Sequence, residues 1–145
     1  MRKLIMLSIF LSFLNCKNDF NKTKPEYYNP GNTAIETLKT MIVSHAESPM
    51  QFHLEVNYYK ENLDEILNSI EIVESVDFRN KYEEELKVVF YKFFVGAKMI
   101  RKVEYFQVRN DKYFIKSEYI SKYSDDSKEK ELAEKIDNWR TINKF

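Results

Sequence analysis

Apolar positions divide this chain into a short continuous run at its start and, after a polar stretch, a series of periodic segments. From Thr33 to Ser48-Pro49 apolar residues recur at helical spacing, and Thr33 with Glu36 has the Thr-x-x-Glu form of a capping box. A residue that precedes proline is driven out of the helical region, so we expect this helix to end at Ser48. It is the clearest helix in the pattern.

The middle of the chain changes period several times. Positions 52–58 alternate apolar and polar residues, which predicts a half-buried strand. Positions 61–70 return to helical spacing, and positions 72–78 predict a short strand. Within 80–95 the periodicity fits either a helix or a strand. The β-branched and aromatic residues of 86–95, followed by Gly96 as a turn, favour a strand.

The last third of the chain predicts a hairpin and a closing helix. Two strands, 99–109 and 112–120, flank Asn110-Asp111, a pair that tolerates the positive φ angles of a tight turn. A helix is predicted from about Asp125, with one apolar stripe formed by Leu132, Ile136, Trp139 and Ile142. The whole pattern predicts an α+β fold in which an N-terminal helix packs on a curved antiparallel meander sheet, with a C-terminal helix.

The opening apolar run has the layout of an export signal. Arg2 and Lys3 give it a positive start, positions 4–14 are mostly apolar, and the run ends at Cys16, the only cysteine. A helix over 4–14 rises only about 17 Å, against about 30 Å of bilayer core, so it is too short to span a membrane. The sequence predicts a cleaved signal peptide (1–15), a lipidated tether (16–32) and one α+β domain (33–145).

The residues before Cys16 resemble the lipobox of bacterial lipoproteins, in which the cysteine after the cut carries the lipid. Phe13-Leu14-Asn15-Cys16 departs from the usual pattern because Leu14 and Asn15 replace small residues. The resemblance implies lipid attachment at Cys16 and an address in the bacterial cell envelope, on the periplasmic or the surface face. An ordinary secreted protein with one free thiol is the alternative.

Composition argues against several kinds of chemistry. Two glycines, Gly31 and Gly96, cannot build a Gly-rich phosphate loop, so no cofactor is expected. Basic and acidic residues balance at 23 each, which gives no electrostatic reason to bind nucleic acid. The two histidines, His45 and His53, lie in no metal-ligand spacing. His53 and Glu55 would share a strand face as an acid–base pair, although an exposed strand face explains them as well.

Three further groups of residues are candidates for binding. Tyrosines of the predicted strands could line a ligand pocket or belong to the core: Tyr58, Tyr91, Tyr105 and Tyr113, with Tyr119 beside them. Basic residues gather on the predicted hairpin and could contact lipid headgroups or protect a sheet edge: Lys98, Arg101, Lys102, Arg109, Lys112 and Lys116. The run Glu83-Glu84-Glu85 could bind a cation, although a solvated charge run explains it better.

The helix that opens after Pro-Gly, the meander and the strand pair from Phe106 to Ile115 resemble the nuclear-transport-factor-two-like (cystatin-like cone) domains. The resemblance covers roughly Thr33 to Ile120. Tyr113 stands where that family often has Trp, and the closing helix from Asp125 is not what the family usually carries. The resemblance implies a sheet that curves around a ligand pocket.

These observations predict a lipid-anchored envelope protein with a non-catalytic domain that binds a protein or a small ligand. An inhibitor or immunity-type lipoprotein, which neutralises a toxin or an enzyme at the envelope, is the alternative. The predicted partners are the membrane, through the N-terminal lipid, and a protein of the envelope. An enzyme that uses His53 and Glu55 is the least favoured interpretation.

Overall fold

The structure is a computed structural model that describes residues 28–47 and 54–141, with side chains from residue 58 onward in the second range. The elements in chain order are α2 (Ala34–Ala46), α3 (Leu54–Glu61), α4 (Leu63–Ser69), β1 (Glu71–Arg79), β2 (Glu85–Val95), β3 (Lys98–Arg109), β4 (Lys112–Ile115) and α5 (Ser127–Thr141). The predicted signal peptide, Cys16 and most of the predicted tether lie outside the described residues.

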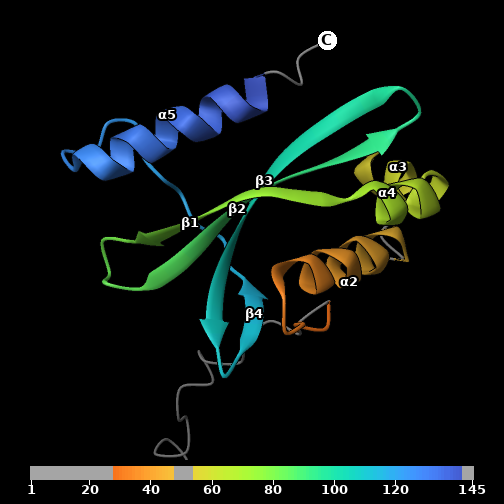
Figure 1. The fold of residues 1–145 in the computed structure, drawn as a ribbon, viewed down its shortest axis with the longest axis horizontal. Helices are drawn as coiled ribbons and strands as arrows, with labels where there is room; N and C mark the ends of the chain where they lie inside the picture. The colour runs from red at the N-terminus through yellow and green to blue at the C-terminus, as the bar shows by residue number, and fades with distance from the viewer. Residues whose placement is uncertain (1–27, 48–53, 142–145) are drawn as a thin grey trace, which may run out of the picture.

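The predicted α+β architecture is confirmed. The four strands form one antiparallel sheet in the order β1-β2-β3-β4, a meander in which each strand pairs with its neighbour in sequence. Figure 1 shows the sheet between two groups of helices, with α2, α3 and α4 on one side and α5 on the other. The C-terminal helix therefore does not extend the N-terminal layer but covers the opposite face.

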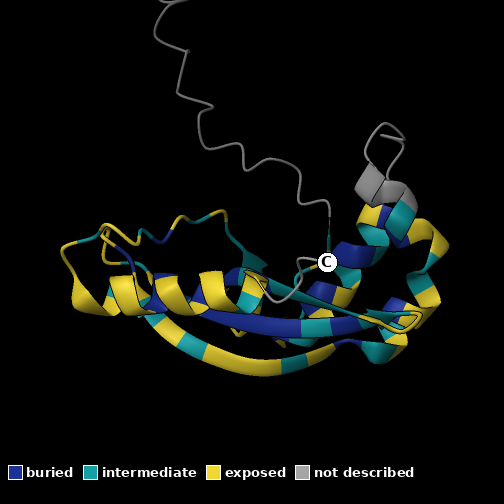
Figure 2. Cartoon of the chain, turned by 90° about the horizontal axis from the view of Figure 1, so that it is seen from above, coloured by how far each residue is buried: buried dark blue, intermediate teal, exposed yellow. Residues whose placement is uncertain are grey.

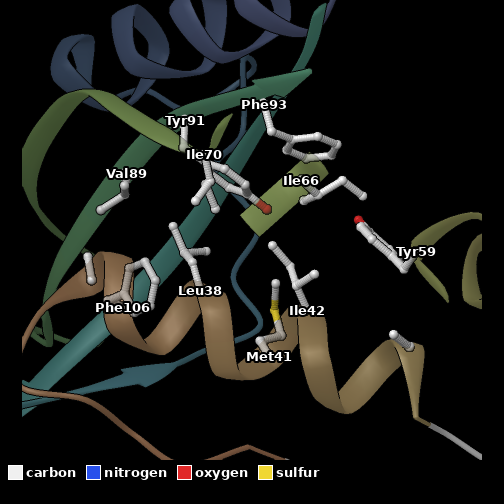
Figure 3. Packing of buried hydrophobic residues seen from close by; sticks show 12 residues of the cluster. Leu38, Met41, Ile42, Tyr59, Ile66, Ile70, Val89, Tyr91, Phe93 and Phe106 are labelled. Atoms are coloured by element: carbon white, nitrogen blue, oxygen red, sulfur yellow. The ribbon is translucent and has the colours of Figure 1, made fainter. Parts of the chain in front are cut away.

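The central strand β2 buries side chains on both faces, which explains why its sequence is almost continuously apolar. Val89, Tyr91 and Phe93 face the N-terminal helices, and Figure 3 shows Tyr91 on the side of Leu38 of α2 and Phe93 beside Ile66 of α4. The alternate residues belong to a second core under α5, together with residues of β3, of the linker before α5 and of α5 itself: Val88, Phe90, Val103, Tyr105, Ile120, Leu132, Ala133 and Ile136. Two separate cores thus hold the helices on the sheet.

Helix α2 begins at the predicted capping box. The Thr33 hydroxyl accepts from the N–H of Glu36, and the Glu36 carboxylate accepts from the N–H of Thr33. The buried Thr37 hydroxyl donates to the carbonyl of Tyr113 in β4 and accepts from the N–H of Gly31. A Cβ at Gly31 would lie 2.5 Å from the Glu36 Cβ, so this close approach requires glycine.

Both predicted turns are confirmed. Asn110 and Asp111 adopt φ angles of 49° and 58° between the paired residues Arg109 and Lys112, the geometry of a two-residue hairpin turn. Gly96, at a φ of 59°, helps to connect β2 to β3. The strand assignments for 72–78 and 86–95 are also confirmed, as is the helix within 61–70.

The strand predicted over 52–58 is wrong over 54–58, because helix α3 begins at Leu54, and positions 52–53 lie outside the described residues. Tyr59 is buried against Phe93, with ring centroids 6.4 Å apart, and shares its core with Ile66 and Ile70. That spacing of four and seven residues continues one helical stripe from α3 into α4, and it outweighs the short alternation before it.

The last predicted strand is shorter than expected. β4 ends at Ile115 rather than Ile120, after which the N–H of Lys116 makes one further bond to the carbonyl of Tyr105. The chain then leaves the sheet toward α5, which begins at Ser127. Leu132 and Ile136 lie in the predicted stripe, Trp139 is half-buried beside them, and Ile142 lies outside the described residues.

Within residues 28–47 and 54–141, none of the helices combines the length and the apolar character that a membrane crossing needs.

Candidate binding groove

A broad open groove of about 1090 Å³ lies between the β1–β2 hairpin and the first half of α5. It forms because α5 covers the middle of the sheet and leaves the far end of the hairpin partly uncovered. In Figure 2 the mostly exposed β1 runs along the lower rim of the molecule and passes under the N-terminal end of α5. The groove therefore lies beside an edge strand of the sheet.

The floor of the groove is apolar. Val76 and Phe78 of β1 are half-buried, whereas Leu86 of β2 and Leu132 of α5 are buried beneath them. Val108 of β3 also lines the groove, is 43% exposed, and lies on the same face of the sheet as Phe106. An open apolar floor of this kind suits the side chains of a partner better than it suits a fully enclosed small molecule.

The rim of the groove is charged and largely paired. Arg79 bonds Glu85 at 2.6 Å and lies 3.5 Å from Glu83, and these carboxylates raise the pKa of the guanidinium. Lys87 bonds Asp77 at 2.7 Å, and this bond raises the pKa of the ammonium. From α5 the rim receives Lys128, Glu129, Glu131 and Lys135. The rim carries both signs of charge.

Asn80 holds the hairpin end of the groove in place. Its buried side chain donates to the carboxylates of Glu84 and Glu118, both at 2.8 Å, and accepts from the N–H groups of Tyr82 and Glu84, both at 3.0 Å. The backbone carbonyl of Asn80 accepts from the N–H of Glu83, a residue with a positive φ of 60°. These bonds fix the turn and join it to the linker before α5, and nothing in the sequence pattern singled out Asn80.

The residues that line the groove include no histidine and no cysteine. The hydroxyl of Ser124, which lines the groove, donates to the carboxylate of Glu129 at 2.6 Å. The same carboxylate accepts from the N–H of Ser121. Asp126 accepts from the N–H of Lys128 at the start of α5. These polar groups stabilise the beginning of α5.

The four candidate tyrosines do not line one pocket. Tyr58, Tyr91 and Tyr113 belong to the core under α2, whereas Tyr105 belongs to the core under α5, on the opposite face of the sheet. Burial raises the pKa of Tyr91 well above its usual value and also raises the pKa of Tyr105. None of the four lines the groove, and Tyr119 is 76% exposed in the linker after β4.

The proposed acid–base pair loses its geometric basis, because Glu55 lies in helix α3 and not in a strand, while His53 lies outside the described residues. His45 is exposed in the last turn of α2, with its ring 6.0 Å from that of Tyr59. Of the three consecutive glutamates, the middle one is only partly exposed, because Glu84 bonds Asn80 and Lys116.

The predicted basic hairpin is divided between two ends of the sheet. Lys98 lies at the β2–β3 turn, whereas Arg109 and Lys112 lie at the β3–β4 turn. The Arg101 guanidinium lies 4.9 Å from the ring centroid of Trp139 and holds α5 on the sheet, and Lys116 bonds Glu84. These cations do not form one continuous patch.

One carboxylate lies in an apolar environment away from the groove. Glu104 of β3 pairs in register with Val89, and so faces the core under α2. Burial raises its pKa to about 7, although the N–H of Tyr105 and the positive charges of Lys102 and Arg140 act in the opposite direction.

Among the described residues, no group of three His, Cys, Asp or Glu side chains could hold a metal ion. Comparison with protein-family models, with curated proteins and with solved structures finds no match. The resemblance to the cone domains therefore stays a prediction from the sequence.

Proposed function

We propose that this chain is a lipid-anchored protein of the bacterial envelope, and that its globular part binds a segment of another protein in the groove between β1, β2 and α5. The observation that carries the proposal is the open apolar floor beside a sheet edge, with Val76 and Phe78 only half-buried. The tyrosines that could have lined an enclosed ligand pocket instead fill the two cores. A protein segment is therefore a better occupant than a small ligand.

The exposed tyrosine at the hairpin turn supports a protein partner. Tyr82 is 68% exposed, lies between two residues that line the groove, and has the Lys81 ammonium 5.0 Å from its ring centroid. Tyrosine is enriched where proteins bind one another, because it contributes a large apolar surface and a polar tip with few rotatable bonds.

The groove is tested by photo-crosslinking in the envelope. A photoreactive phenylalanine analogue replaces Glu131, which lines the groove from α5, and in a matched control it replaces Lys39, an exposed residue of α2. We expect one discrete protein adduct from position 131 and none from position 39. Identical adducts at both positions, or none at position 131, would contradict the proposal. An adduct with a toxin or a secreted enzyme would identify the inhibitor alternative.

The anchor is tested separately, because Cys16 lies outside the described residues. The Cys16→Ala variant is expected to lose palmitate labelling and to move from the membrane fraction to the soluble fraction. A variant that still incorporates palmitate would refute lipid attachment at this residue. The wild-type chain, processed in the same cells, is the control.

A further inference from the structure

We infer that the partner of the groove binds as an extended strand added to the open edge of β1, and that this segment alternates apolar and basic residues. The inference rests on the function proposed above and adds its binding mode and the chemistry of the partner. In the part of the chain that the structure describes, β2 is the only strand that pairs with β1. The outer edge of β1 is therefore available for backbone hydrogen bonds.

The turn between β1 and β2 identifies which backbone groups face outward. The N–H of Asn80 donates to the carbonyl of Glu84 at 3.0 Å. In an antiparallel pair the residues that bond the partner strand alternate, so every second residue counted back from Asn80 bonds β2 through its backbone. The N–H and carbonyl groups of Ser75, Asp77 and Arg79 then point away from the sheet. They form a row of donors and acceptors that an added extended chain can pair with along its length.

The charged side chains of β1, which could protect it as an edge strand, are paired within the molecule. β1 contains no lysine and no proline, and each of its three carboxylates has a lysine partner within the molecule. These pairs are Glu71 with Lys92, Glu74 with Lys135, and Asp77 with Lys87. A bulge between Ile72 and Glu74 interrupts the first part of the strand and leaves the regular edge from Ser75 onward.

The two faces of β1 differ, and this difference determines the alternation of the partner. Val76 and Phe78 face the groove under α5, so apolar side chains of an added strand would lie beside them. Asp77 and Arg79 pair in register with Lys87 and Glu85, on the other face. A basic residue of the partner would lie there beside Asp77, whose side chain is 84% exposed.

Charge also distinguishes this partner from a second copy of the chain. β1 has three carboxylates and one guanidinium, whereas the lysines that pair with these carboxylates lie on other elements, Lys87 and Lys92 on β2 and Lys135 on α5. Two β1 strands side by side would bring these carboxylates together, which is unfavourable, whereas a basic strand complements them.

The test uses a capped nine-residue peptide in which lysine and valine alternate, with a matched peptide that carries glutamate in place of lysine. We expect the lysine peptide to slow hydrogen exchange at the amides of Ser75, Asp77 and Arg79 by at least about tenfold, because these groups become hydrogen-bonded. The glutamate peptide should leave exchange unchanged. Equal protection by both peptides, or protection elsewhere only, would overturn the inference.

Two sets of variants separate strand addition from loose association. Ser75→Pro removes an outward N–H without removing a bond to β2, and should abolish binding of the lysine peptide, whereas Ser75→Ala should retain it. In two further peptides the backbone nitrogens of all the valines or of all the lysines are methylated. Only alternate N–H groups of an added strand face β1, so one of these two peptides should fail to bind and the other should still bind. Binding that survives Ser75→Pro or both methylations would refute the strand geometry.

The remaining outcomes separate this inference from the proposed function. Amides of Ser75, Asp77 and Arg79 that become protected as the concentration of the protein alone is raised would assign the edge to a second copy, and would overturn the inference. If the peptides fail while position 131 still crosslinks to a partner, the groove binds a protein in another mode. Loss of both results would overturn the proposed function as well.

Discussion

The carboxyl of Glu104 makes the stability of this fold depend on pH, in the direction opposite to that of most carboxylates. Its pKa is about 7 in the folded chain, against an ordinary value of 4.5, because burial disfavours the charged form. Below pH 4.5 the group is protonated in both the folded and the unfolded chain and has no effect. Between pH 4.5 and 7 the unfolded chain ionises first, so the free energy of unfolding falls, and above pH 7 the loss is complete.

The magnitude follows from the shift. Each pKa unit corresponds to about 1.4 kcal/mol, so a rise from 4.5 to about 7 corresponds to about 3 kcal/mol at most. Glu104 is half-buried and keeps some contact with water, which reduces the loss. We therefore expect the wild-type chain to lose about 1–3 kcal/mol through this group between pH 4 and pH 8.

The assay is urea unfolding at unit steps from pH 4 to pH 8, followed by the fluorescence of Trp139, the single tryptophan. Glu104→Gln replaces the protonated carboxyl with a neutral group of the same shape. The variant should match the wild type near pH 4 and exceed it by about 1–3 kcal/mol at pH 8. Glu134→Gln, at an exposed position of α5, is the matched control.

The reasoning fails if the difference between Glu104→Gln and the wild type is the same at every pH. It also fails if the control variant, Glu134→Gln, differs from the wild type in free energy of unfolding at pH 8 and matches it near pH 4, as is expected of Glu104→Gln. A carboxyl titration of Glu104 by NMR with a midpoint near 4.5 would contradict the raised pKa directly.

Three further substitutions test the packing, the cap and the turn. Trp139→Ala should destabilise the fold by about 3–5 kcal/mol, because the indole packs edge-on against Phe90 and donates to the carbonyl of Lys102. Urea unfolding followed by circular dichroism measures this loss of stability. A loss below about 1 kcal/mol would contradict the docking of α5. Thr33→Ala should cost about 1 kcal/mol by removing the cap of α2, and an unchanged thermal midpoint would argue against that cap. Asp111→Gly should stabilise the chain by about 0.5–1 kcal/mol, because glycine adopts a φ of 58° without strain; a lower thermal midpoint would show that the aspartate side chain matters more.

Local interactions explain why some elements could be predicted from the sequence. The capping box of α2 and the Asn110-Asp111 turn depend on residues within four positions of one another, so their geometry follows from the chain itself. The density of β-branched and aromatic residues in β2 likewise reflects burial on both faces.

The strand prediction for 52–58 failed for a physical reason. A few alternating apolar residues fit a strand, but the burial of Tyr59 together with Ile66 and Ile70 favours the helical path, and that burial depends on contacts with Phe93 far along the chain. The end of β4 is similar, because Ile120 leaves the sheet to join the core under α5.

By itself the sequence determined the fold class, most of the elements, two tight turns and the prediction of a lipid at Cys16, because each depends on short-range patterns of residue type. The tertiary structure alone decided which face of the sheet each helix covers and which edge stays open. It separated Tyr105 from Tyr91 and placed the groove where α5 leaves Phe78 partly uncovered. Such features arise from contacts between residues distant in sequence, and no local pattern contains that information.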